Sequence, residues 1–440
     1  MADGRMPGGV PGARAGVIRH GRQRTSRAWA TVLAVLASAV AVVLVSGVSV
    51  AAIAAWDLSR SVQPLIVLPP ADTDHPDAPP PQIGAYEGGI NLLLIGSDSR
   101  QGQGTAFGDP EEETGELNDV NILLHISADH SNATVVSFPR DLFVDIPECT
   151  NADGDSTGPA TDKINTALFY GGVPCAVATI EDLTGLTIPF VAEVQFLGVI
   201  AMSNAVGGVP VCVSDRIEDE YTGTYLDPGM HDLSGVDALQ FLRTRHGVGD
   251  GSDLSRIGNQ QVFLSSLVRT VKSSETLGDP FKLYGLAKAA LDNMRFSESL
   301  ANLDTMVSIA IALKDIPEQN IAFVQYPGSV TVEGVYQNEE SAAVLFDAIA
   351  ADQPVLPTGS TGLGSTLGLG GPDEVPVDPA APVDPAAPVD PAAPVDPAAP
   401  VDPAAPPADA GAPVAALPDD VLGQTADEVT CSNGRTLEEQ

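Results

Sequence analysis

Positive charge is scarce in this sequence. Of its 440 residues, 21 are lysine or arginine and 58 are aspartate or glutamate, so the formal net charge is −37. Seven of the basic residues but only two of the acidic ones lie in the first 60, which leaves 14 basic and 56 acidic residues for the rest. Because nucleic-acid binding needs a basic surface that releases counterions, we expect no nucleic-acid partner. A small anion site built from a few arginines is compatible with this composition.

Cysteine is also rare, and no two cysteines have the C-x-x-C spacing that is typical of zinc sites. Cys149, Cys175, Cys212 and Cys431 allow three complete disulfide pairings, and the sequence does not choose among them. A bridge among the first three is favoured, because an exported location permits disulfides. The alternative is that these three are small buried apolar residues.

Residues 28–56 contain no charged side chain. As a helix they would span about 43 Å, more than the roughly 30 Å of a bilayer core. Arginines precede this run, so the positive-inside rule predicts a single-pass cell-membrane protein with a cytoplasmic N-terminus and an extracytoplasmic domain. A cleaved signal peptide is the alternative, although the run is longer than a typical signal core.

Composition divides the rest of the chain. Five consecutive copies of Val-Asp-Pro-Ala-Ala-Pro occupy residues 377–406. Their prolines favour an extended polyproline rod of about 90 Å, most simply a passive spacer. The last stretch, residues 417–440, either docks on the domain or stays disordered. We predict a cytoplasmic basic arm (1–27), a transmembrane anchor (28–56), a stalk (57–84), one catalytic domain (85–352), a disordered linker (353–412) and a short C-terminal segment (413–440).

Short apolar runs alternate with helical patterns between residues 90 and 350. Residues 90–95, 121–126, 133–138, 209–213 and 321–326 are predicted strands. A polar turn at 129–132 predicts that the second and third are antiparallel neighbours. Helical spacing is found at 175–184, 234–244, 254–271, 283–313 and 341–350. This alternation predicts an α/β domain in which helices flank both faces of a mixed β-sheet.

Three of the few arginines, Arg243, Arg245 and Arg256, fall within one 14-residue window. If the first two lay on a strand, their side chains would point to the same side. Arg256 is expected in the first turn of the next helix, with Gln260 one turn later on the same face. Arginine binds phosphate oxygens in a bidentate manner, so the cluster suits a diphosphate. Ordinary surface salt bridges are the alternative.

Further charged residues lie at the ends of predicted strands, where α/β proteins commonly place their ligand sites. Arg140 follows the run at 133–138, Asp98 follows the first strand and Asp119 precedes the next. Asp253 lies beside Arg256. Such carboxylates can hold Mg²⁺, or Mn²⁺ as the alternative, against phosphate oxygens. Each aspartate alone is equally explained as a turn or helix-cap residue.

Several of these segments together resemble the LytR-CpsA-Psr family, and the cysteines and the loop before Asp253 resemble its actinobacterial branch. The resemblance covers residues 88–350. The segments that carry it are NLLLIGSDSR at 91–100, VVSFPRD at 135–141, KINTALFYGG at 163–172, VGGVPV at 206–211, ALQFLRTRH at 238–246 and DLSRIGNQQ at 253–261.

The resemblance implies a phosphotransferase that moves a glycopolymer from a polyprenyl-pyrophosphate carrier in the cytoplasmic membrane to peptidoglycan, through a phosphodiester. It implies pyrophosphate binding by Arg100, Arg140, Lys163, Asn165, Arg243, Arg245, Arg256 and Gln260. It implies metal binding by Asp98, Asp119 and Asp253, and catalytic roles for Asp98, Asp119 and Arg140. Asp98 and Asp119 are both candidates for the carboxylate that accepts the acceptor's proton.

The sequence departs from the family pattern at two positions. The family's Arg-Ser-Asp-Thr element reads Leu117-Asn-Asp-Val120, and Asn259 replaces the second arginine of Arg-x-x-Arg-Gln-Gln. The loss of two positive charges motivates one alternative function, a non-catalytic protein that binds lipid or cell wall. A second alternative is a lipid pyrophosphatase that uses water as acceptor.

Overall fold

The computed structural model comprises two compact units, Met1–Trp56 and Asp57–Gln440. The predicted basic arm, most of the predicted stalk and the proline-rich repeats lie outside the described residues. The structure describes residues 28–58, 60, 65–69, 86–105, 107–109, 111–112, 115–151, 153–357, 361–368 and 415–440.

The first helix, α1, covers Ala28–Leu58, two residues beyond the predicted anchor. By length and composition alone, the segment Val35–Leu58 of this helix could cross a membrane.

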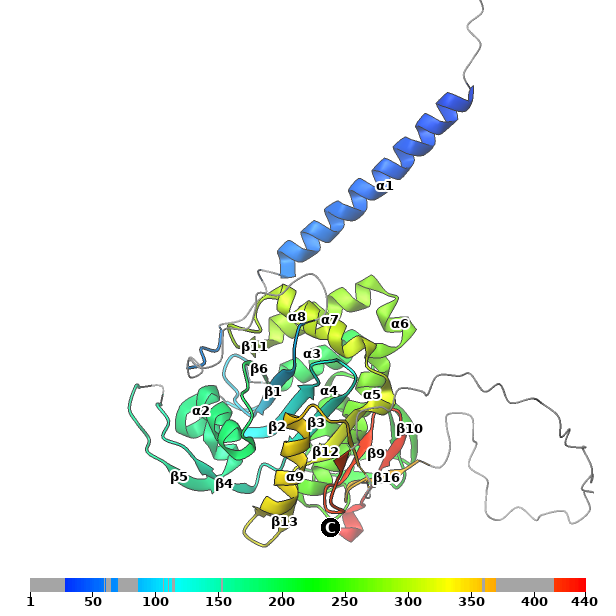
Figure 1. Cartoon of the computed structure of the whole chain (residues 1–440). Coiled ribbons are helices and arrows are strands. Elements are labelled where there is room, and N and C mark those ends of the chain that lie inside the picture. The colour runs from blue at the N-terminus through cyan, green and yellow to red at the C-terminus, as the bar shows by residue number, and fades with distance from the viewer. Residues whose placement is uncertain are drawn as a thin grey trace, which may run out of the picture. The chain divides into compact units, whose positions relative to one another are not determined.

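A seven-stranded mixed sheet forms the centre of the second unit (Figure 1). Its strands, in spatial order, are β11 (Met294–Phe296), β6 (Phe190–Val194), β1 (Ile90–Ser97), β2 (Asn118–Ile126), β3 (Ala133–Phe138), β12 (Ile321–Gln325) and β18 (Gly423–Thr425). The predicted antiparallel pair β2–β3 is confirmed. The β1–β6 and β3–β12 pairs are parallel.

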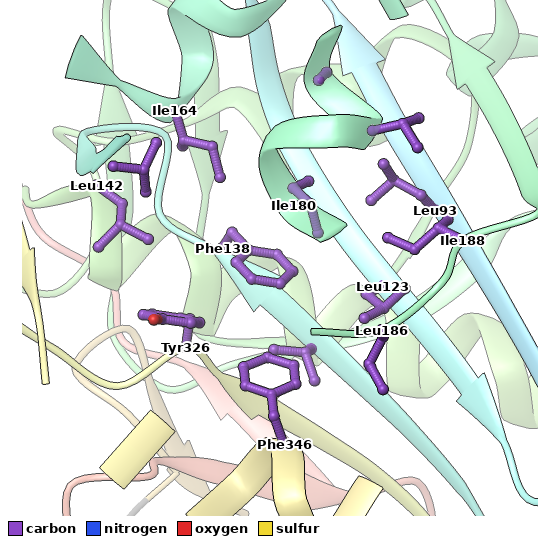
Figure 2. Packing of buried hydrophobic residues seen from close by; sticks show 14 of the residues in the cluster. Leu93, Leu123, Phe138, Leu142, Ile164, Ile180, Leu186, Ile188, Tyr326 and Phe346 are labelled. Carbon is purple, nitrogen blue, oxygen red and sulfur yellow. The ribbon is translucent and has the colours of Figure 1, made fainter. Parts of the chain in front are cut away.

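Helices cover both faces of this sheet, which confirms the predicted α/β class. Alternate residues of β1 enter different cores, as expected for a strand that is buried on both sides. Leu93 and Ile95 pack with residues of α2 (Ala167–Thr184) and α9 (Glu339–Ala350). Figure 2 shows part of this core, in which the rings of Phe138 and Phe346 stack 6.3 Å apart.

The opposite face of the sheet packs against a second set of helices. Leu92 and Leu94 of β1 lie there with residues of α5 (Asp253–Lys272), α7 (Pro280–Asn293) and α8 (Leu303–Asp315). Residues 283–313 are predicted to form two helices, and these are observed as α7 and α8, with β11 between them.

Shorter sheets flank the centre. One has the order β10-β7-β19-β16 and another the order β13-β14-β4-β5. The remaining strands are β4 (Leu142–Ile146), β5 (Ala160–Lys163), β7 (Val209–Val213), β8 (Ile217–Asp219), β9 (Thr224–Leu226), β10 (Gly229–Leu233), β13 (Gly328–Val330), β14 (Val335–Gln337), β15 (Val355–Leu356), β16 (Ser365–Leu367), β17 (Ala415–Ala416) and β19 (Thr430–Ser432). The remaining helices are α3 (Phe196–Val206), α4 (Gly235–Arg243), α6 (Ser274–Leu277), η1 (Ile164–Thr166), η2 (Glu318–Asn320) and η3 (Leu437–Glu439).

Of the two alternatives for residues 417–440, docking is the one observed. β18 pairs with β12 at the edge of the central sheet, and β19 lies between β7 and β16. Strands β15 and β16 also fall inside the range predicted as linker, 353–412. These strands are only two or three residues long, and they form by pairing with distant segments rather than by a periodic pattern of their own.

The two disulfides are Cys149–Cys175 and Cys212–Cys431. The first is a bridge among the three favoured cysteines, so that prediction is confirmed. The second joins β7 to the C-terminal segment across a sequence separation of 219 residues. The rival interpretation, three free buried cysteines, is wrong.

Candidate functional site

A cavity of about 420 Å³ opens between the central sheet and helices α3, α4 and α5. One part of its wall is charged, with Arg140, Arg243, Arg245, Asp98 and Asp119. The other part is apolar, so the cavity matches a ligand with a charged head and a hydrocarbon tail. The apolar lining includes Leu94, Val120, Ile122, Val199, Met202, Leu239, Leu242, Phe263, Leu264 and Leu267.

Arg140 lies two residues after the end of β3 and lines the cavity. Its guanidinium donates to Asp119 Oδ1 at 3.0 Å, and its backbone N–H donates to Asp253 Oδ2 at 2.9 Å. Asp253, buried at the start of α5, also pairs with Arg256 at 2.8 Å. Arg256 in turn donates to the Asp119 carbonyl at 2.8 Å. The carboxylates of Asp119 and Asp253 therefore hold Arg140 and Arg256 in place.

Arg243 and Arg245 both reach the cavity, the first from the end of a helix and the second from the loop that follows it. Arg243 ends helix α4, and Thr244 turns the chain out of the helix with φ −60° and ψ 134°. The Arg243 guanidinium lies 4.6 Å from the centre of the Phe196 ring, a cation–π contact. Arg245 donates to the Gly251 carbonyl at 3.1 Å.

The helix predicted over residues 234–244 is confirmed, because residues 235–243 form α4. Burial lowers the pKa of Arg243, the charges of Asp119 and Asp98 oppose this, and the charges of Arg100 and Arg256 add to it. Because arginine ordinarily titrates above pH 12, Arg243 remains charged and available to an anion.

The other predicted binding residues divide into two groups. Gln260 lines the cavity and donates to the Leu242 carbonyl at 3.0 Å. Arg100, Lys163 and Asn165 do not line it, although all three are among the described residues. Lys163 pairs with Asp141 at 2.9 Å, and the Asn165 N–H donates to the Arg140 carbonyl at 3.2 Å. Arg100 donates to the Phe107 carbonyl at 2.9 Å.

The predicted metal ligands are not assembled as a set of three. Among the described residues, no three histidine, cysteine, aspartate or glutamate side chains are grouped to hold a metal ion. The reason is that Arg140 lies between Asp119 and Asp253, so that Asp253 neutralises arginines instead.

Asp98 and Asp119 nevertheless face the same cavity. Burial raises the pKa of Asp98, the Leu117 N–H opposes this, and the charge of Asp119 adds to the rise. Mg²⁺ is usually bound by one or two carboxylates together with substrate phosphates and water. The Asp98–Asp119 pair therefore fits an ion whose coordination the substrate completes.

The two departures from the family pattern have different surroundings. The Leu117 backbone N–H donates to Asp98 Oδ1 at 2.8 Å, so this residue orients a candidate catalytic carboxylate. Asn259 is fully buried and does not line the cavity. Its amide donates to the Phe241 carbonyl at 2.7 Å and accepts from Ser432 of the C-terminal segment. Asn259 thus links α4 to the C-terminal strand β19.

Two carboxylates of the site were missed by the sequence analysis. Asp219 is fully buried and accepts from the Thr244 hydroxyl at 2.7 Å and from the Arg245 N–H at 3.1 Å. Asp141 lies 3.9 Å from Arg245 and also pairs with Lys163. Asp141 could have been found, since it directly follows Arg140. Asp219 gives no such signal, because it ends a three-residue strand far along the chain from the arginines.

Fold and site together define an α/β protein with an arginine-rich cavity that continues into an apolar interior. The chain belongs to the LytR-CpsA-Psr family, because it matches the LytR_cpsA_psr family over residues 71–350.

Relatives of the chain include proteins that are named for roles in the cell wall. It is 30% identical over 285 residues to the "Cell wall biosynthesis protein LcpA" of Corynebacterium glutamicum, covering 59% of this chain and 54% of that protein. It is 29% identical over 233 residues to the Bacillus subtilis "Polyisoprenyl-teichoic acid--peptidoglycan teichoic acid transferase TagT", covering 49% of this chain and 66% of the relative. The chain spans about half the length of the first of these relatives.

Solved structures are also similar. "TagT bound to LI-WTA" has 21% identity and a TM-score of 0.46, and the match covers 65% of this chain and 98% of that one. A LytR-Csp2A-Psr enzyme from Actinomyces oris has 20% identity and a TM-score of 0.47, and the match covers 66% and 95%.

Proposed function

We propose that this protein is a phosphotransferase that attaches a glycopolymer, carried on polyprenyl pyrophosphate, to peptidoglycan through a phosphodiester. One observation carries the proposal: a single cavity joins a cluster of arginines to an apolar interior. A pyrophosphate head matches the arginine forks, and a polyprenyl tail matches the apolar wall. The names of the relatives support the same class of reaction.

Direct attack on phosphorus fits the residues of the site. A hydroxyl oxygen of the acceptor forms a bond to the phosphorus that carries the glycan. The bond from that phosphorus to the bridging oxygen breaks, and polyprenyl phosphate leaves. The four arginines of the cavity would stabilise the negative charge that spreads over the phosphoryl oxygens, namely Arg140, Arg243, Arg245 and Arg256.

Asp98 is our candidate for the group that accepts the proton of the attacking hydroxyl. Its raised pKa makes it a stronger base than an ordinary aspartate. Asp98 and Asp119 would hold Mg²⁺, which would neutralise charge on the phosphates. Asp253 would act through the arginines that it positions.

We also propose that α1 anchors the protein in the cytoplasmic membrane, with its N-terminus inside the cell and the second unit outside. The arginines before residue 28 support this orientation. The two disulfides support an oxidising compartment for the second unit.

The first prediction tests the cavity. Full-length protein in nanodiscs, given a polyprenyl-pyrophosphate glycan, Mg²⁺ and peptidoglycan, should release polyprenyl phosphate and form a glycan–peptidoglycan phosphodiester. Arg243→Ala and Arg245→Ala should each lower this rate at least about 100-fold, because each removes a charged donor at the phosphoryl group.

Arg216→Ala is the matched control, because Arg216 is 53% exposed, pairs with Glu218 and does not line the cavity. Its rate should equal that of the wild type. Release that does not depend on peptidoglycan would favour the pyrophosphatase. Lipid binding without release would favour the non-catalytic binder. Wild-type rates in both cavity variants would rule out the assigned site.

A further inference from the structure

An aromatic pair forms part of the rim of the cavity. The rings of Tyr221 and His246 lie 4.6 Å apart, centre to centre, at an interplanar angle of 39°. Both residues line the cavity that contains Arg243 and Arg245. Tyr221 is 74% exposed, so His246 supports the ring while most of its surface faces solvent. A supported but uncovered aromatic ring beside an anion site is suited to a ligand that has an apolar face.

Asp219 fixes this pair relative to the arginines. One of its carboxylate oxygens accepts from the Tyr221 N–H at 3.0 Å and from the Thr222 N–H at 3.3 Å. The other accepts from Thr244 and from the Arg245 N–H. A single buried carboxylate therefore holds the backbone of the exposed ring and the backbone of a phosphate-binding arginine.

The hydrogen bonds of Asp219 also keep it charged. Burial alone would raise the pKa of Asp219, but the Thr244 hydroxyl and three backbone N–H groups outweigh this effect and lower the pKa. The link between ring and arginine consequently consists of charge-assisted hydrogen bonds, which are stronger than neutral ones. The spacing between the ring and Arg245 is thus built into the fold.

We infer that Tyr221, supported by His246, is a stacking platform for the sugar ring that is attached directly to the pyrophosphate. The inference rests on the proposed function and names a further binding element of the same site. One face of a pyranose ring presents C–H groups with a slight positive charge, and the face of an aromatic ring is negative. A sugar joined to a diphosphate bound by Arg243 and Arg245 lies within reach of this rim.

Two ligands test the inference: farnesyl pyrophosphate, and farnesyl pyrophosphate that carries one N-acetylhexosamine. Binding to the full-length protein is measured by calorimetry. Tyr221→Ala should weaken binding of the sugar-bearing lipid about two- to tenfold, the range expected for one ring-stacking contact. The same variant should bind the bare lipid as the wild type does, and Tyr221→Phe should retain both affinities.

Tyr225→Ala is the matched control, since Tyr225 is 54% exposed on the neighbouring strand β9 and does not line the cavity. Both of its affinities should be unchanged. If the wild type and Tyr221→Ala bind the sugar-bearing lipid with equal affinity, the inference about Tyr221 is wrong and the proposed function still stands. The same conclusion follows if Tyr221→Ala loses affinity equally for both lipids. Failure of the wild type to bind either lipid would instead overturn the proposed function, and the platform with it.

Discussion

Buried carboxylates organise the arginines of this protein. Asp253 and Asp219 accept the backbone N–H groups of Arg140 and Arg245, respectively, so the backbone of each arginine is held beside the cavity that its side chain lines. A carboxylate that accepts backbone N–H groups fixes the position of a residue more firmly than a flexible side-chain pair does. In an acidic chain, positive charge is concentrated at one site because a few acidic residues act as its scaffold.

Asp98 gives a prediction at the residue scale. Burial, with the added charge of Asp119, raises the pKa of Asp98, so this group stays protonated to a higher pH than the ordinary value of about 3.9. Carbon-13 NMR of the Asp98 carboxyl should show this elevated midpoint. Asp119→Asn should move the midpoint to lower pH, because it removes a repelling charge.

Transferase activity should also depend on this ionisation. Asp98 must be ionised to accept a proton or to hold Mg²⁺, so activity should fall as the pH drops. Because bound Mg²⁺ favours the ionised carboxylate, the midpoint of activity should lie below the midpoint of the metal-free carboxyl. A carboxyl midpoint at or below the ordinary aspartate value would contradict the proposed role.

At the scale of elements, α5 and the C-terminal segment depend on each other. Residues 254–271 have an amphipathic pattern, yet the first half of α5 is buried on nearly all sides. Its polar groups contact the C-terminal segment: Gln424 donates to the Gln261 backbone carbonyl and to the Ser265 hydroxyl, and Ser432 donates to the Asn259 side chain. Arg256 and Gln260 of the same helix line the cavity.

The Cys212–Cys431 bridge should therefore protect α5. The double variant Cys212→Ser, Cys431→Ser should lower the free energy of unfolding by about 2–5 kcal/mol, because the bridge closes a long loop. Amide hydrogen exchange in the first half of α5 should accelerate as the C-terminal segment detaches.

The double variant Cys149→Ser, Cys175→Ser is the control, since that bridge joins segments away from α5. It should lower stability without a selective change in the exchange of α5. Unchanged protection of α5 in the first variant would show that hydrogen bonds and strand pairing suffice to hold the segment.

At the scale of the whole molecule, the chain returns to its own domain after the proline-rich repeats. Strand β16 precedes the repeats and strand β19 follows them, and the two pair directly. Residues 377–406 are thus a connection between two docked segments and not a terminal tail. A spacer that leads to a separate module would not need a strand after it, such as β18, that pairs with the central sheet.

Deleting residues 377–406 should leave transferase turnover in vitro within about twofold of the wild type, because the repeats contain no basic residue that could bind the pyrophosphate. Melting temperature should be measured in parallel. A large loss of turnover at an unchanged melting temperature would place the repeats in catalysis.

The sequence by itself determined the apolar N-terminal segment, the α/β class, the family and the arginines that meet in one cavity. These features rest on composition, on periodic patterns several residues long and on contiguous motifs. Arg140, Arg243, Arg245 and Arg256 could be predicted because each lies beside a recognisable strand or helix end.

Only the tertiary structure decided the partner of Cys212, the scaffold role of Asp219, the setting of Asn259 and the insertion of β18 and β19. Each depends on segments far apart in sequence, and the strands involved are only three to five residues long. Such short strands carry no periodic signal and form only when a neighbour supplies their hydrogen-bonding partners.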